Sequence, residues 1–236
     1  MSTVQGGQGN IVTNGLILNL DAANPRSYEP PFNGTTWQNL VAVSSSISGL
    51  LTNGPVFSTS GSGCFLFDGT NDHVNCGSVF NYTTQNFSFS YWIYFNSFST
   101  NIANQGPITL YKGQYIQNGY YAQVNSSGSI GFLTNNPGTF TVSSTDNGSL
   151  VTGSWCNITH VRSGSSIRTY INGIDRTTTA SIHPDPSSTG NNFLINTYNT
   201  FIYGNTKIGS FYNYNRALNA SEVLQNFNAT RARFGV

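Results

Sequence analysis

Residues 207–227 read KIGSFYNYNRALNASEVLQNF, and this stretch predicts a strand, a turn and one short helix near the C-terminus. Apolar and small side chains alternate along Lys207–Tyr212, which is the period of a β-strand. Ile208 and Ser210 would share one face of that strand. Gly209 and Phe211 would share the other.

The helix that follows has a recognisable start. Asn219 precedes Glu222 by three residues, so an amide oxygen can cap the helix while the carboxylate reaches back to the cap. Val223, Leu224 and Phe227 then fall on one predicted face.

The rest of the chain predicts strands and almost no further helix. Phe87, Phe89, Tyr91, Ile93 and Phe95 alternate along one aromatic strand face, and the opposite face is expected to be half buried. Turn residues separate the segments, as in a sandwich or barrel. The other strand-like segments are Gly15–Asp21, Cys64–Asp68, His73–Cys76, Ile108–Tyr111, Gly119–Val124, Ile130–Leu133, Ser154–Arg162 and Ser166–Ile171.

Composition excludes several classes of protein. The chain has 236 residues, which suits a single β-domain at 15–236. Only 7% of residues are charged and the net charge is +1. This composition argues against a disordered chain, because such chains combine low hydrophobicity with high net charge. It also argues against nucleic-acid binding, which needs clustered Lys and Arg. No apolar run approaches the ~20 residues that span a bilayer. The surface must be built from Asn, Ser, Thr, Gly and Gln, which suits contact with hydroxyl-rich ligands.

Met1–Asn14 is rich in Gly and Gln, and we expect a flexible arm that tethers the domain. It has no basic and apolar signal region. A protein with an extracellular type of surface and no signal suggests release by lysis, as for a virion protein made in a host cytoplasm.

The three cysteines are expected to be buried, reduced thiols. Cys64 and Cys76 flank a predicted hairpin centred near Thr70, so a bridge between them is the alternative. No Cys-x-x-Cys or His cluster suggests zinc.

Five segments, taken in order, carry a family resemblance: GLILNLDAANPRSY (Gly15–Tyr28), FLFDGTNDHV (Phe65–Val74), FSFSYWIYF (Phe87–Phe95), SWCNITHVRSGSSIRTYINGI (Ser154–Ile174) and the C-terminal segment through Arg233. Together they resemble the concanavalin A-like lectin/glucanase superfamily in its laminin-G-like branch. The resemblance implies an all-β, antiparallel jelly-roll β-sandwich with one short C-terminal helix. The particular start and end resemble domains of bacteriophage fibres and adhesins.

One departure from the family concerns calcium. An acidic residue is common after the tryptophan that corresponds to Trp37, but Asn39 stands in this region. Asp68, Asn71 and Asp72 cluster in sequence and could supply oxygen ligands. The alternative is a turn that caps itself, and we expect no metal and no other cofactor.

Catalysis is not expected. Glycoside hydrolysis needs two carboxyl groups about 5–9 Å apart, and no strand carries two acidic residues at alternating positions. His73, His160 and His183 lie far apart in sequence with no nucleophile elbow.

Sugar binding is the sharper hypothesis, because amides, hydroxyls and aromatic faces together hold glycans. Two loops combine these groups, Lys112–Tyr121 and Asn196–Asn205. We expect exposed contacts there, against the alternative that the rings only cover the sandwich edge. The candidate residues are Tyr115, Gln117, Tyr198, Asn199 and Tyr203.

Together with the residues above, the resemblance implies a non-enzymatic phage virion protein, such as a head or tail fibre, decoration protein or adhesin, that binds host-surface glycans. Its arm would bind other virion proteins, and a homo-oligomer would add avidity. The alternatives are a purely structural decoration protein, a free bacterial carbohydrate-binding module and a glycosidase.

Overall fold

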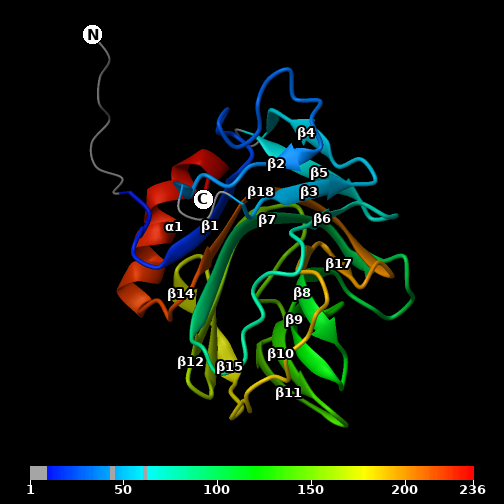
Figure 1. Cartoon of the computed structure of the whole chain (residues 1–236), viewed down its shortest axis with the longest axis vertical. Helices are drawn as coiled ribbons and strands as arrows, with labels where there is room; N and C mark the ends of the chain where they lie inside the picture. The colour runs from blue at the N-terminus through cyan, green and yellow to red at the C-terminus, as the bar shows by residue number, and fades with distance from the viewer. Residues whose placement is uncertain (1–9, 43–45, 61–62) are drawn as a thin grey trace.

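Two antiparallel β-sheets packed face to face, with one helix on the outside, form the domain (Figure 1). The computed structural model describes residues 10–42, 46–60 and 63–236. Every strand pair in it is antiparallel, which confirms the expected all-β sandwich with one C-terminal helix.

The first sheet, called sheet A, is built around two long strands, β7 and β18. Its path is β14 (Ile174–Asp175), β13 (Ser166–Ile171), β12 (Trp155–Ser163), β7 (Phe87–Thr100), β18 (Ile202–Tyr214), β5 (Cys64–Asp68) and β4 (Val56–Ser58), and β1 (Leu16–Asp21) and β17 (Thr197–Tyr198) also pair with β18.

The second sheet, called sheet B, lies across the core from sheet A. Its path is β15 (Thr177–Thr179), β11 (Thr139–Thr145), β10 (Ile130–Asn136), β9 (Asn118–Val124), β8 (Ile108–Gln114), β16 (Leu194–Ile195), β6 (His73–Asn75), β3 (Gly49–Thr52) and β2 (Thr36–Trp37).

Strand β7 is buried on both faces along most of Phe87–Phe95. Its predicted aromatic face lies in the core between the sheets. On the other face, which was expected to be half buried, Ser88, Ser90 and Trp92 are buried and Tyr94 is partly exposed; helix α1 (Ala220–Phe234) covers this face at Trp92. Trp92 stacks on Phe234 with ring centroids 4.3 Å apart, and its indole N–H donates to Thr230 Oγ1 at 2.8 Å.

Two predictions for the C-terminal stretch were wrong in detail. A bulge interrupts β18 between Ile208 and Ser210, so Ile208 and Phe211 both point into the core instead of to opposite faces. On α1, Val223 and Phe227 are buried, but Leu224 is 44% exposed.

The predicted hairpin around Thr70 was also wrong. β5 pairs with β4 and β18 in sheet A, whereas β6 pairs with β3 and β16 in sheet B. The turn at Gly69–Asp72 therefore crosses from one sheet to the other, and the segment cannot close a two-stranded ladder. All three cysteines are buried and free, as expected, and burial raises the pKa of Cys76 and Cys156 to about 12.

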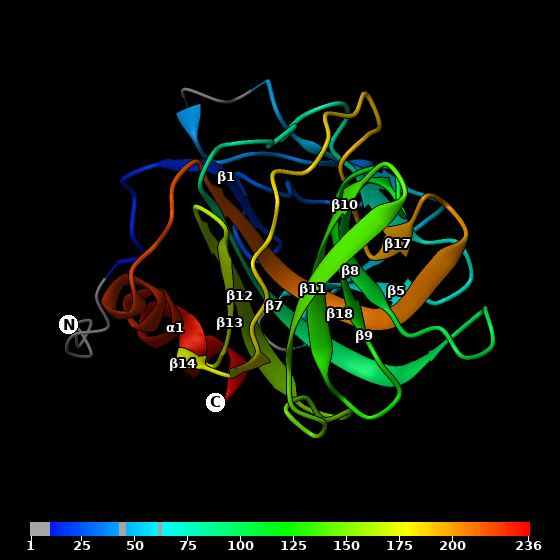
Figure 2. The same ribbon diagram turned by 90° about the horizontal axis from the view of Figure 1, so that it is seen from below.

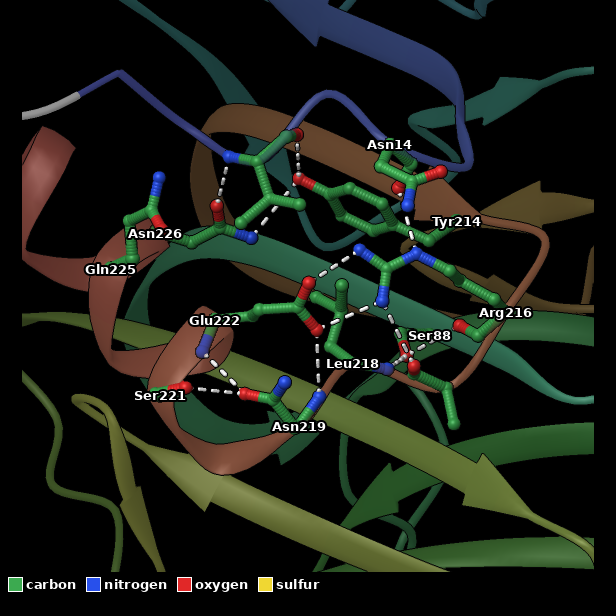
Figure 3. Close-up of polar contacts among 12 residues, drawn as sticks. Asn14, Ser88, Tyr214, Arg216, Leu218, Asn219, Ser221, Glu222, Gln225 and Asn226 are labelled. Atoms are coloured by element: carbon green, nitrogen blue, oxygen red, sulfur yellow. Dashed lines mark hydrogen bonds and ion pairs between the residues drawn. The ribbon is translucent and has the colours of Figure 1, made fainter.

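Residues 10–14 of the predicted arm are packed against the domain (Figure 3). The Val12 amide donates to Asn226 Oδ1 at 2.8 Å, and the Tyr214 hydroxyl donates to the Val12 carbonyl at 3.0 Å. Arg216 Nε donates to the Asn14 carbonyl at 2.9 Å. This part of the arm belongs to the domain, and residues 1–9 lie outside the described residues.

In the part of the chain that the structure describes, no helix has the length and apolar character needed to cross a membrane.

Candidate functional site

A cleft of about 680 Å³ lies on the outer face of sheet B, the face turned away from the core. Figure 2 shows strands β9, β10 and β11 on the opposite side of the molecule from α1. The lining residues come from six strands and three connecting segments: Ile102, Gln105, Ile108, Tyr115, Tyr121, Gln123, Leu133, Phe140, Tyr198, Phe201 and Ile202.

The floor of the cleft is made by strand alternation. On β9, Tyr120 and Ala122 point into the core, so Tyr121 and Gln123 point outward. On β10, Phe132 points inward and Leu133 outward. Outward-facing apolar residues of neighbouring strands thus form a second apolar cluster on the far side of the sheet.

Tyr115 stands on a tight turn between β8 and β9, and two glycines make this turn close. Gly113 and Gly119 face each other across the ladder, with φ of 120° and 71°. A Cβ on Gly119 would lie 1.9 Å from the Lys112 carbonyl oxygen. Only glycine fits there, because L-residues have neither the space nor the favoured backbone geometry.

A second turn carries Tyr198 and Phe201 to the cleft. The Phe201 amide donates to the Tyr198 carbonyl at 2.8 Å, and both central residues, Asn199 and Thr200, have positive φ (43° and 61°). This is the geometry of a type I′ turn, and a β-branched Thr there is strained. Such strain is typical of functional loops.

Asn101 braces this second turn. Its Nδ2 donates to the Phe201 carbonyl at 2.7 Å, and its Oδ1 accepts from the Tyr203 amide at 3.0 Å. The segment after β7 and the β17–β18 turn are therefore held together at the cleft.

The two loops that sequence reasoning singled out meet at the cleft. The Tyr115 amide donates to the Tyr198 hydroxyl at 2.9 Å, although the residues are 83 positions apart. The Tyr198 ring lies edge-on to Tyr121 at 5.5 Å, and Tyr115 lies 5.1 Å from Phe140. Four rings from four segments therefore form a continuous aromatic wall.

The rim combines exposed rings with amides. Tyr115 is 41% exposed and Phe201 is 63% exposed, so both offer a ring face or edge to solvent. Gln123 Nε2 donates to Gln105 Oε1 at 2.9 Å, which leaves further amide donors and acceptors for a ligand. Burial raises the pKa of Tyr198 and of Tyr121, so both hydroxyls stay neutral.

The five predicted contact residues lie in different surroundings in the structure. Tyr115 and Tyr198 line the cleft. Gln117 is exposed at the β8–β9 turn, and Asn199 lines a separate depression of about 330 Å³ on the other side of its turn. Tyr203 corrects the expectation of exposure: it is only 8% exposed, its hydroxyl donates to the Thr200 carbonyl, and it supports the turn from beneath.

Sequence reasoning missed most of the floor and one wall. Tyr121, Gln123 and Leu133 lie on predicted strands, and their outward direction follows from alternation. Two adjacent tyrosines at Tyr120–Tyr121 are a signal that both faces of β9 are covered. Phe140 lies on β11, which sequence reasoning did not identify.

The weak calcium candidates Asp68, Asn71 and Asp72 accept hydrogen bonds within and beside their own turn. Asp68 Oδ1 accepts from the Thr70 amide at 2.7 Å, and Asp72 Oδ2 accepts from the Asp68 amide at 3.1 Å. The Asn71 carbonyl accepts from Asn53 Nδ2 at 3.0 Å. Within the described ranges, no three His, Cys, Asp or Glu side chains gather as a metal site would need.

The Asn39 amide, which stands where a family carboxylate is common, has a structural role. Its Oδ1 accepts from the Asn19 amide at 2.8 Å and from the Val41 amide at 3.1 Å, and its Nδ2 donates to the Ile17 carbonyl. It therefore fastens the segment after β2 to β1.

Half of the acidic residues form ion pairs away from the cleft. Asp185 pairs with Arg162 at 2.5 Å, and Glu222 pairs with Arg216 at 2.6 Å. The other two pairs are Asp21–Arg233 and Asp175–Arg168.

The histidines are buried and hydrogen-bonded. His160 lies between the hydroxyls of Tyr91 and Thr169, and His183 lies between those of Thr134 and Ser143. His73 packs against Tyr203, in keeping with the expected packing role.

Comparison with known families shows the family to which the chain belongs. It belongs to the concanavalin A-like lectin/glucanases superfamily, whose Laminin_G_3 profile matches residues 68–224. No curated protein matches the sequence significantly.

Solved structures with the same fold come from toxins and from an enzyme. The binding domain of paraclostridial mosquitocidal protein 1 aligns with a TM-score of 0.68 at 15% identity, over 91% of this chain and 52% of that one. The ligand-binding domain of botulinum neurotoxin serotype D, in complex with N-acetylneuraminic acid, aligns with a TM-score of 0.67 at 13% identity, over 90% and 50%.

Trypanosoma rangeli sialidase aligns with a TM-score of 0.63 at 14% identity, over 94% of this chain and 34% of the enzyme. The chain thus spans about half, or less, of the solved chains it resembles. At these identities the likeness shows the fold alone.

Proposed function

We propose that this protein is a non-enzymatic glycan-binding module and that the cleft on the outer face of sheet B is its binding site. The observation that carries the proposal is the cleft itself. Exposed rings stand beside glutamine amides, and none of its lining residues is charged. Sugar rings present apolar C–H faces and polar hydroxyls, so an aromatic wall with an amide rim complements both.

The comparisons support this proposal because domains with the same fold bind ligands in other proteins. Two of them are a binding domain and a ligand-binding domain of toxins, and the second is in complex with N-acetylneuraminic acid. They use the same fold for recognition in their own proteins.

The non-enzymatic part of the proposal is supported by where the carboxylates lie. Glycoside hydrolysis places two carboxyl groups beside the bound sugar. None of the residues that line this cleft is acidic, and four acidic residues are engaged in ion pairs.

As the setting for this activity we propose the surface of a bacteriophage particle. The resemblance of the first and last segments to phage fibre domains supports this setting, as does the weakly charged surface. Repeated copies would raise avidity for a weak ligand. Mass spectrometry of purified particles tests the setting, and absence of this polypeptide from particles would contradict it.

Binding is tested on a glycan array with the purified protein in multivalent form. We expect Tyr115→Ala and Phe201→Ala each to weaken binding to the positive glycans by about tenfold, because each removes an exposed ring worth roughly 1–2 kcal/mol in a contact. Both side chains are exposed, so the fold should survive.

The matched control is Ile182→Ala, which removes an apolar side chain that is 83% exposed and lies outside the cleft lining. This variant should bind as the parent does. No binding by the parent at high valency would contradict the proposal and favour a purely structural role.

A further inference from the structure

Three depressions follow one another across the outer face of sheet B. The aromatic cleft shares Gln105, Gln123 and Leu133 with a more polar groove of about 340 Å³ that runs over β10 and β11. On the other side, the turn that carries Tyr198 and Asn199 separates the cleft from the depression of about 330 Å³ over β8 and β16. Together they form an extended surface for a ligand larger than one sugar.

The lining of this whole surface is uncharged. Among the residues that the structure describes, none that borders the three depressions is Lys, Arg, His, Asp or Glu; the polar groups are amides, hydroxyls and backbone. The chain has nine Lys and Arg residues, and none of them lines these three depressions.

The one basic residue on strands β8–β11 is turned away from the surface. Lys112 follows the outward-facing Tyr111, is fully buried, and donates from Nζ to the Asn191 carbonyl. Four arginines are engaged in ion pairs with carboxylates, Arg162, Arg168, Arg216 and Arg233. No cation among the lining residues of these depressions can therefore meet an anionic sugar.

From this we infer that the site selects uncharged sugar rings and rejects the same rings when they carry a carboxylate. The inference rests on the proposed function and names its ligand class. A ring hydroxyl that enters the cleft can exchange water for an amide or tyrosine partner. A carboxylate there loses hydration and gains no counter-ion, which is costly in an apolar setting.

The selectivity differs from that expected of a site for sialic acid. Sialic acid carries a carboxylate, and recognition of carboxylates favours a bidentate Arg or a cluster of N–H donors. The cleft offers ring faces, neutral hydroxyls and glutamine amides instead.

The test is an array of size-matched pairs in which each hexose stands beside its hexuronate, with sialylated and unsialylated galactosides included. We expect the protein to bind neutral members and to bind the matched uronates at least about tenfold more weakly. Binding only to the uronates or sialosides would overturn this inference and leave the proposed function standing. Absence of binding to every spot would overturn both.

A charge-introducing variant tests the cause. Gln105→Lys places a cation at the rim, on an exposed side chain. We expect the ratio of neutral to uronate binding to fall severalfold, because the carboxylate now has a partner. Gln38→Lys, at an exposed glutamine outside all three depressions, adds the same charge and should leave the ratio unchanged. An unchanged ratio in Gln105→Lys, or an equal fall in Gln38→Lys, would contradict the inference.

Discussion

Gly209 shows how one residue joins the helix to the sheet. It lies at the bulge of β18, and a Cβ at this position would come within 2.5 Å of the Phe234 ring. Phe234 has little room to move, since Trp92 stacks on it at 4.3 Å and Trp155 lies 4.8 Å away. The missing side chain thus lets the helix approach the strand closely.

We expect Gly209→Ala to destabilise the protein by about 1–3 kcal/mol, the usual cost of overpacking a well-filled core. Urea unfolding followed by tryptophan fluorescence measures this. Gly190→Ala is the matched control, because no atom lies within 4 Å of its added Cβ and its φ is not positive. Equal midpoints for the two variants would refute the packing argument.

At the scale of the element, α1 depends on its first turn. Asn219 Oδ1 accepts from the Glu222 amide at 3.0 Å, and Glu222 Oε2 accepts from the Asn219 amide at 2.9 Å, which completes the capping box (Figure 3). Arg216 holds the same carboxylate through two N–H groups, at 2.6 and 2.8 Å, and this contact lowers the pKa of Glu222. The cap also fixes where the helix starts above sheet A.

Asn219→Ala should lower the free energy of unfolding by about 1 kcal/mol, because the Glu222 amide loses its acceptor. Asn219→Ser keeps an oxygen at the cap and should retain most of that stability. Thermal and chemical unfolding of the two variants provide the comparison. If serine were as destabilising as alanine, capping would not be the reason.

At the scale of the whole molecule, the interior holds two neutral histidines. Burial lowers the pKa of His160 to about 3 and that of His183 to about 4. In the unfolded chain both would titrate near about 6.5. Between these values the unfolded state binds more protons, so stability is complete above about pH 6.5 and falls as the solution is acidified.

We expect the free energy of unfolding to drop by about 3–4 kcal/mol between pH 7.5 and pH 5.0, roughly 1.4 kcal/mol per pH unit for each histidine. Denaturant titrations across this range measure the slope. His183→Gln keeps a donor and an acceptor between Thr134 and Ser143, and it should reduce the slope by about half. Stability that stayed constant over this range would show that the histidines are not held neutral.

Sequence patterns predicted the elements that depend on neighbours along the chain. The aromatic face of β7 and the capping box of α1 follow from local spacing. The close approach at Gly209 and the burial of Trp92 did not follow, because both depend on contact with Phe234 of α1, which lies far along the chain from each of them.

The candidate site was predictable only in part for the same reason. Aromatic and amide content drew attention to the loops that carry Tyr115 and Tyr198, and the fold brings those residues into contact. Tyr198 and Tyr203 both lie in the same Asn- and Tyr-rich segment, Asn196–Asn205, yet Tyr203 is buried and Tyr198 lines the cleft. Which tyrosine turns outward is decided by the β17–β18 turn, where two positive-φ residues set the direction.

The packing of residues 10–14 on α1 has a practical consequence for how this protein can be displayed. Asn10 and the C-terminal helix share one side of the molecule, and strands β9–β11 lie on the other (Figure 2). A chip linkage through a tag that follows Val236 would therefore turn the recognition surface toward the flowing analyte. Captured in that orientation, neighbouring copies would present their clefts in parallel, and a polymeric ligand could bridge them.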